Sequence, residues 1–308
     1  MTPKEVRDMA ASVRRRLRNL AAEKGEEAGF VLTRYAVQRL LHRLGRSEYR
    51  DRFLLKGATL FAVWSDQPHR PTRDLDLLGF GDTAIPSMEE IFRSLCGQRD
   101  PEDGLDFPPE LVRGERIRGD EEYQGVRVSL TAMLGKSRIP LQVDVGFGDD
   151  VFPAPQETEV PGLLGLEAAN VRAYPREAVV AEKLQVIVAL GIANSRMKDF
   201  HDIWVLSREF PFSADPLVES VRRTFARRRT PVPALAPLAL TAEFAADGNK
   251  RVQWKAFVRK GKLDTTSELR EVIGALAEFL VPVLAAAAGR DALNATWVPG
   301  GPWLGTPT

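Results

Sequence analysis

Residues 53–78, FLLKGATLFAVWSDQPHRPTRDLDLL, decide the fold of this chain. The apolar run FLL predicts a short buried strand; Lys56 and Gly57 then end the run, and ATLFAVW predicts the start of a helix. At the other end, residues 74–77 alternate, so Asp74 and Asp76 share one face of a second strand while Leu75 and Leu77 occupy the other. The stretch therefore predicts a strand–helix–strand unit.

This unit also carries the residue types of a site for nucleotide and metal. Asp74 and Asp76 lie about 6.6 Å apart along a strand, a spacing at which two carboxylates can share divalent cations. Gly57 allows backbone N–H groups to approach a phosphate at the start of the helix. For an isolated DLD, the favoured alternative is that the aspartates face solvent on a half-exposed strand. The upstream glycine and a third carboxylate favour the site instead.

The third carboxylate comes from a predicted hairpin. Residues 126–134 and 139–147 alternate as strands and are separated by a short turn. The apolar face of the second strand is formed by Ile139, Leu141, Val143 and Val145. Asp144 lies on the opposite face. We therefore expect Asp144 to join Asp74 and Asp76 as a metal ligand, with Mg²⁺ or Mn²⁺ as the metal.

Composition narrows the class of protein. The chain has 308 residues, enough for one large domain or two of ordinary size, and its 44% apolar content is that of a soluble globular protein. A single cysteine, Cys96, excludes an intramolecular disulfide, and three scattered histidines argue against a structural zinc site. The most apolar stretch, residues 279–289, is too short to span a bilayer. We expect a cytoplasmic protein without a membrane segment.

The chain is expected to divide into two halves. Residues 99–120 are polar and rich in Pro and Gly, which predicts a surface loop, and residues 148–173 mark the passage to the second half. Helices are predicted in the second half at 177–190, 197–207, 217–229, 252–260 and 267–288. The predicted fold is α/β (α+β): a mixed sheet with helices over residues 1–150, followed by a mostly helical domain over residues 151–308 that closes an active-site cleft.

The order of these motifs resembles a known family. A glycine followed by the D-x-D strand is similar to the nucleotidyltransferase superfamily that includes DNA polymerase β. Within it, LLKGATLF…RPTRDLDLL, LQVDVGFGD (141–149) and residues 174–206, which contain EKL and KDFHDIWVL, resemble the AbiEii/AbiGii toxins. These toxins, together with the MenT-like toxins, are the nucleotidyltransferase half of bacterial toxin–antitoxin pairs. The resemblance covers roughly residues 30–210 and implies the nucleotidyltransferase fold.

The resemblance implies phosphate contacts around the first motif. The candidates for binding the NTP there are Lys56, Gly57, Thr59, Thr72 and Arg73. Ala58 stands where the family has Gly or Ser, so Thr59 or Thr72 is the candidate to supply the missing hydroxyl. Arg73 could instead pair with a local carboxylate.

Three further catalytic candidates lie in the second half. Lys183 stands among apolar residues of the helix 177–190, where a lysine usually extends its ammonium group to solvent; the resemblance instead implies contact with the NTP. In KDFHD, Lys198 and Asp202 could form an exposed ion pair. The resemblance implies that Asp199 or Asp202 completes the active site, and Asp202 is the first choice.

By the resemblance, the reaction is metal-dependent transfer of NMP from an NTP to RNA, with the tRNA 3′ end as the acceptor, which would block translation and growth. A cognate antitoxin is implied in the same way. Two basic segments, 14–18 and 217–229, would suit RNA phosphates or are simply solvated surface. Two other classes stay open: a nucleotidyltransferase that modifies a protein or a small hydroxylated molecule, and a non-catalytic nucleotide-binding protein.

Overall fold

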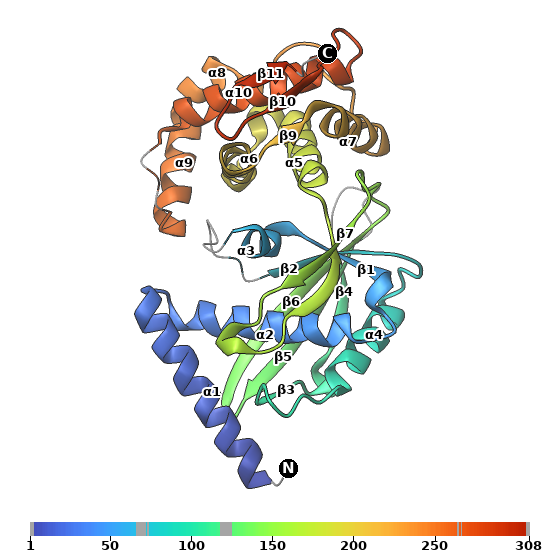
Figure 1. The fold of residues 1–308 in the computed structure, drawn as a ribbon, viewed down its shortest axis with the longest axis vertical. Coiled ribbons are helices and arrows are strands. Elements are labelled where there is room, and N and C mark those ends of the chain that lie inside the picture. Colours follow the sequence, from blue (N-terminus) through green and yellow to red (C-terminus); the bar gives the residue numbers. More distant parts are fainter. Residues whose placement is uncertain are drawn as a thin grey trace. The chain divides into compact units, whose positions relative to one another are not determined.

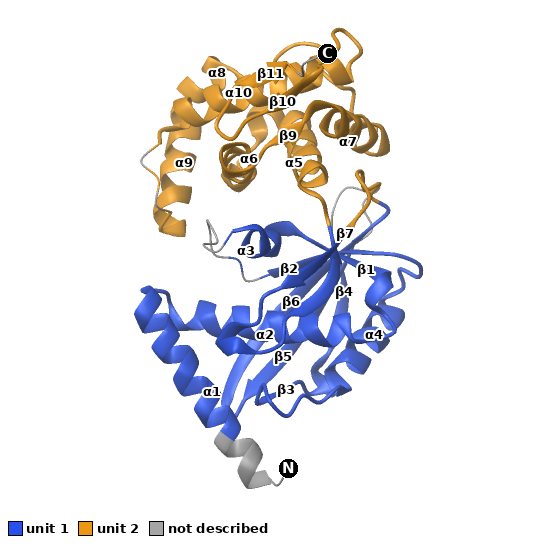
Figure 2. Ribbon diagram, viewed as in Figure 1, with its two compact units in different colours: residues 1–148, 156–173 blue, residues 149–155, 174–308 orange. Residues whose placement is uncertain are grey.

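The computed structural model describes residues 3–65, 72, 74–117, 125–263, 265 and 267–305, with side chains from Met9 onward. The chain forms two compact units (Figure 2). The first unit consists of Met1–Gly148 and Gln156–Ala173, and the second of Asp149–Pro155 and Tyr174–Thr308.

The first unit is built on a mixed sheet (Figure 1). Its strands are β1 (Phe53–Lys56), β2 (Asp74–Gly79), β3 (Leu105–Asp106), β4 (Arg113–Ile117), β5 (Gly125–Leu134), β6 (Ser137–Phe147), β7 (Gln156–Val160) and β8 (Ala169–Ala173). Their order is β3-β5-β6-β2-β1-β8-β7, and β4 also pairs with β5. The β2–β6 and β1–β8 pairs are parallel, and the other pairs are antiparallel. The strands that carry the predicted carboxylates, β2 and β6, are therefore direct neighbours in the interior of the sheet.

Four helices and four short 3₁₀ turns complete this unit. They are α1 (Pro3–Lys24), α2 (Ala28–Gly45), α3 (Phe61–Trp64), α4 (Ile85–Gly97), η1 (Arg50–Arg52), η2 (Gly57–Leu60), η3 (Pro109–Leu111) and η4 (Leu163–Gly165). Helix α2 crosses the sheet and packs on β6 and β8, whereas α4 packs on β4 and β5 (Figure 1). The core lies between these helices and the apolar face of the sheet, where Leu75, Leu77, Val143 and Val145 are buried.

Charged residues are also buried beneath α2. Arg39 and Arg43 are each 2% exposed, and both pair with Asp103, which is fully buried; the Arg43 Nη1–Asp103 Oδ2 distance is 2.7 Å. The Tyr35 hydroxyl donates to the Asp103 carbonyl at 2.7 Å. Removing one partner of such a buried pair costs about 3–5 kcal/mol, because an uncompensated charge stays in the core.

The second unit is mostly helical. Its elements are α5 (Arg176–Leu190), η5 (Gly191–Ala193), α6 (Met197–Glu209), β9 (Phe212–Ser213), α7 (Ala214–Arg227), η6 (Leu238–Leu240), α8 (Ala242–Ala246), α9 (Gly248–Gly261), α10 (Leu269–Ala287), β10 (Ala295–Trp297) and β11 (Trp303–Gly305). Helix α10 packs against α6, α7 and α8, and α5 packs against α6 and α7. The ring of Phe279 contacts Phe212, Trp297 and Trp303, which ties the small β11-β10-β9 sheet to α10.

This architecture confirms the predicted α/β class, the strand–helix–strand unit and the β5–β6 hairpin. Two segments differ from their prediction. Residues 99–120 contain β3 and β4, and residues 148–173 contain β7 and β8. These short strands extend the sheet, and several of their residues are exposed and polar. The alternation of apolar residues that marks a half-buried strand is therefore weak in both segments. Among the described helices, none is long and apolar enough to span a membrane.

Candidate active site

Gly57 and Asp76 face each other at the centre of the first unit. Strands β1 and β2 pair so that Lys56 lies opposite Asp76, and the chain turns into η2 at Gly57 with a φ of +74°. A Cβ atom at Gly57 would overlap the carboxylate of Asp76. Glycine is required here both for the positive φ and for the close approach of the carboxylate.

The three predicted carboxylates come from two adjacent strands. In the parallel β2–β6 pair, Asp76 lies opposite Asp144, and Asp74 lies opposite Gln142. Asp74 is exposed, while Asp76 and Asp144 are half-buried. Because partner residues of neighbouring strands point to the same side of a sheet, the three aspartates share the face opposite the buried leucines and valines.

Arg127 is a member of this group that the sequence analysis missed. It lies opposite Asp144 in the β5–β6 hairpin, and its Nε and Nη2 donate to Asp144 Oδ1 and Oδ2, each at 2.9 Å. This forked hydrogen bond raises the pKa of the Arg127 guanidinium. The hairpin turn was the feature of the sequence that could have indicated this pair. Leu134 pairs with Ser137 at the turn, and counting residues outward along both strands from there places Arg127 opposite Asp144.

The carboxylates fit a metal site that the nucleotide would complete. Within the described ranges, no three His, Cys, Asp or Glu side chains lie close enough together to hold a metal ion alone. Asp144 is turned toward Arg127. Magnesium usually takes one or two carboxylates and fills its shell with phosphate oxygens and water. Asp74 and Asp76 match that donor set, and Asp144 could join them by leaving Arg127.

The other phosphate-binding candidates lie around the same strands. Lys56 ends β1, and Thr59 is buried in η2. The hydroxyl of Thr72 donates to the Asp74 carbonyl at 3.3 Å, so it lies beside the first metal-ligand candidate. Arg73 lies outside the described residues.

Lys183 is the centre of a second cluster, in the second unit. From α5 its Nζ lies 2.8 Å from Asp199 Oδ1 and 2.8 Å from Asp202 Oδ2, both on α6. The side chains of Asp199 and Asp202 are 1% and 0% exposed, so both carboxylates are buried and do not lie on a solvated surface. Arg196 adds a hydrogen bond to Asp199 Oδ2 at 2.7 Å. Both aspartates of KDFHD therefore hold the same lysine.

The charges of this cluster act on Asp199. Burial alone would raise the pKa of the Asp199 carboxyl, but the nearby Lys183 and Arg196 outweigh burial and lower it. Asp199 is thus held ionised, and the ammonium of Lys183 is fixed between two carboxylates instead of extending into solvent.

Three arginines of the basic segment 217–229 have partners within the protein. Arg228 is 10% exposed and pairs with Asp149 at 3.1 Å and Glu182 at 3.3 Å. Arg222 donates to the carbonyls at the end of α10, and Arg223 pairs with Glu219. Arg222 and Arg223 of α7 and its C-cap residue Arg228 are thus engaged within the second unit.

A mixed sheet that carries a glycine turn against a D-x-D strand, with a third aspartate on the neighbouring strand, defines the nucleotidyltransferase class. The model of the nucleotidyl transferase AbiEii toxin family, of Type IV toxin–antitoxin systems, matches residues 39–278. The chain belongs to this family.

Two solved structures from Helicobacter pylori are similar to the chain. They are described as JHP933 and as a putative nucleotidyltransferase. Each is 14% identical to this chain with a TM-score of 0.42 over 82% of it, and the match covers 86% and 89% of the two structures, respectively. No curated protein matches the sequence.

Proposed function

We propose that this protein transfers NMP from an NTP to an RNA acceptor, the 3′ end of tRNA, and releases pyrophosphate. The observation that carries the proposal is the pairing of Gly57 with Asp76, with Asp144 opposite on β6. A binding protein has no need of converging carboxylates around a glycine turn. Family membership supports nucleotidyl transfer and a toxin–antitoxin context.

The first unit supplies the carboxylates in this proposal. Asp74 and Asp76 hold Mg²⁺ or Mn²⁺ together with the phosphates of the NTP, and Lys56 and the backbone of the Gly57 turn contact those phosphates. The bound metal would stabilise the attacking and the leaving oxygen of an in-line displacement. Asp144 would join Asp74 and Asp76 as a ligand of this metal, once its carboxylate has left Arg127.

Lys183 neutralises phosphate charge in this proposal. A lysine held by two buried carboxylates loses the mobility that an exposed lysine keeps, so its ammonium is oriented before the NTP binds. Asp199 and Asp202 act through Lys183 by fixing its position. The EKL and KDFHD motifs, which carry the family resemblance, support placing this cluster in the catalytic machinery.

The cellular consequence follows from the acceptor. A tRNA whose 3′ end carries an added nucleotide cannot be aminoacylated normally, so translation and growth would stop. We propose that the protein acts in the cytoplasm, where NTP and tRNA meet, and that a cognate antitoxin counters it.

The acceptor class is tested by labelling. The purified protein is incubated with Mg²⁺ and each of the four α-³²P-labelled NTPs, with total RNA, total protein or neither. We expect label in the tRNA fraction with at least one NTP. Label in protein alone, or in a small molecule, would reassign the acceptor; no label in any fraction would contradict nucleotidyl transfer.

A further inference from the structure

Helix α9 carries an unusual distribution of charge. Its sequence, GNKRVQWKAFVRKG, contains five Lys or Arg residues and no Asp or Glu. Lys250 is buried and donates to the Asn194 carbonyl at 2.8 Å. Arg251, Lys255 and Arg259 are exposed and follow one another at intervals of four residues, so they form one row along the helix.

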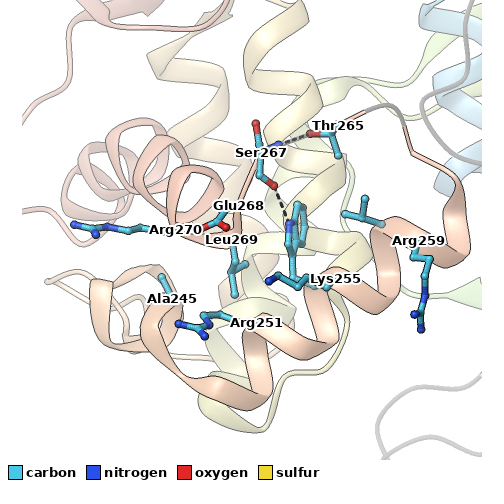
Figure 3. Close-up of a pocket in the computed structure, with 11 residues that line it drawn as sticks. Ala245, Arg251, Lys255, Arg259, Thr265, Ser267, Glu268, Leu269 and Arg270 are labelled. Atoms are coloured by element: carbon cyan, nitrogen blue, oxygen red, sulfur yellow. Dashed lines mark hydrogen bonds between the residues drawn. The ribbon is translucent and has the colours of Figure 1, made fainter.

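The row borders a pocket of about 400 Å³ between α9 and the start of α10 (Figure 3). Arg270 of α10 adds a fourth exposed cation to its lining, and Thr265 and Ser267 add hydroxyl groups. In the pocket wall, the indole N–H of Trp254 donates to the Ser267 carbonyl at 3.0 Å and holds Ser267 against α9.

The acidic lining residue is already engaged. The Glu268 carboxylate accepts the backbone N–H of Glu271, and the Glu271 carboxylate accepts the backbone N–H of Glu268, so both cap α10. In the described part of the chain, no hydrogen bond or ion pair engages the side chains of Arg251, Lys255, Arg259 or Arg270. By contrast, the exposed Arg93 and Arg223 each have a glutamate four residues away.

This arrangement is unfavourable for folding alone. Arg251–Lys255 and Lys255–Arg259 are like-charge pairs at i,i+4, which destabilise a helix. Arg270 lies in the first turn of α10, where the helix dipole disfavours a cation. An anion bound along the row would reverse all three effects.

The spacing favours a polyanion. The three cations of α9 lie about 6 Å apart along the helix axis, over about 12 Å in total. A single phosphate could not contact all of them, whereas a chain of phosphates can. Protein partners are usually anchored by exposed aromatic side chains, and Trp254, the aromatic residue of the pocket lining, is only 3% exposed.

We propose that Arg251, Lys255, Arg259 and Arg270, here called the α9 surface, bind the phosphate backbone of the RNA acceptor. The identity of the polyanion as the acceptor rests on the proposed function. The α9 surface takes the place of the α7 segment, whose arginines are engaged within the unit.

The test replaces the four residues of the α9 surface by Gln in the full chain. A control variant removes four exposed charges that belong to no candidate RNA surface: Lys24→Gln, Arg116→Gln, Lys136→Gln and Arg138→Gln. Binding of a fluorescein-labelled oligoribonucleotide of about 16 nucleotides is measured by anisotropy without NTP, between about 50 and 200 mM salt. Thermal melting checks that each variant is folded.

We expect the α9 variant to bind roughly tenfold or more weakly, with a slope of log affinity against log salt shallower by about 3, because four phosphate contacts are lost. The control variant should bind like the parent. Unchanged binding by the α9 variant would overturn the proposal, as would equal losses in both variants, which would indicate an effect of total charge. Competition by poly-glutamate as effective as that by unlabelled RNA would assign the surface to an acidic protein and also overturn it.

The RNA-binding measurement does not depend on nucleotide transfer. Binding is measured without NTP, so a chain that fails to transfer nucleotides can still lose RNA affinity in the α9 variant. Conversely, RNA labelling with an unchanged KM for RNA in the α9 variant would leave nucleotidyl transfer standing and remove the α9 surface from the acceptor path.

Discussion

At the scale of single residues, the central contact is the one between Gly57 and the Asp76 carboxylate. Asp76 can occupy its position only because residue 57 has no Cβ, and the φ of +74° at Gly57 also disfavours any other residue. The glycine therefore sets the position of a metal-ligand candidate as well as the shape of the turn.

Gly57→Ala tests this contact. We expect the variant to lose at least roughly 100-fold in nucleotide transfer through a displaced Asp76, and about 1–3 kcal/mol of stability through the strained φ. Labelled-NMP transfer and thermal melting measure the two effects. Gly146→Ala on β6 is the matched control, because a Cβ there meets no atom within 4 Å. Full activity of Gly57→Ala would show that Asp76 does not depend on the glycine.

Arg127 offers a second test at this scale. It competes with the metal for Asp144, so Arg127→Gln should raise the affinity of the NTP-free protein for Mn²⁺ by roughly tenfold. Titration calorimetry measures this affinity directly. Arg127→Lys keeps the charge but loses the forked hydrogen bond, so its Mn²⁺ affinity should lie between those of Arg127→Gln and the parent. Equal Mn²⁺ affinity in all three proteins would exclude Asp144 from the metal site.

The Lys183 cluster predicts a pH dependence of stability. The folded-state pKa of Asp199 lies below its ordinary value of 3.8, so its contribution to stability is fully present above that pH and is lost as the pH falls through the folded pKa. Asp199→Asn should cost about 3 kcal/mol at neutral pH, at the low end for a broken buried pair because Asp202 still holds Lys183.

Denaturant unfolding at several pH values checks this expectation. The difference between the parent and Asp199→Asn should be constant near neutral pH and shrink below pH 3.8. Glu278→Gln, an exposed substitution on α10, should change stability by less than about 0.5 kcal/mol. A difference between the parent and Asp199→Asn that grows as the pH falls would contradict the assigned direction of the pKa shift.

At the scale of elements, the strands that sequence patterns predict are those with one buried and one polar face. β2 and β6 alternate because Leu75, Leu77, Val143 and Val145 enter the core, so both could be predicted together with their aspartates. β7 extends the sheet at an edge through the polar residues QETEV, and no local pattern distinguishes it from a loop.

The buried ion pairs could not be predicted for a related reason. Arg39 and Arg43 lie in a helix whose sequence is amphipathic, and their partner Asp103 comes from a segment about 60 residues further along the chain. Lys183 with Asp199 and Asp202 is a similar case, since α5 and α6 had to be packed together before the three could meet.

Helix α7 shows how partners decide the role of a basic segment. Arg228→Gln should destabilise the second unit by about 3 kcal/mol, because Asp149 and Glu182 lose their shared partner. For RNA binding, the slope of log affinity against log salt should be the same for Arg228→Gln as for the parent. Arg223→Gln, on the same helix but exposed, is the control and should leave the melting temperature unchanged. A stable Arg228→Gln variant with a shallower salt slope would return α7 to the RNA surface.

At the scale of the whole molecule, the net charge is only +1. Positive charge is nevertheless concentrated in single segments such as α9. Of the basic segments visible in the sequence, 217–229 has arginines engaged within its unit, whereas α9 has no acidic residue. Sequence motifs were sufficient to indicate the family and the carboxylates, because both depend on spacing within single strands and helices. The unpaired surface depends on which side chains meet after folding.

The fate of the NTP phosphates is the most direct test of nucleotidyl transfer by this protein. Parallel reactions contain RNA, Mg²⁺ and the preferred NTP labelled with ³²P at either the α or the γ position, with the parent protein or Asp76→Asn. We expect α-label in RNA, γ-label in pyrophosphate, and neither product with Asp76→Asn. Transfer of γ-label to RNA, or undiminished α-labelling by a folded Asp76→Asn variant, would contradict it.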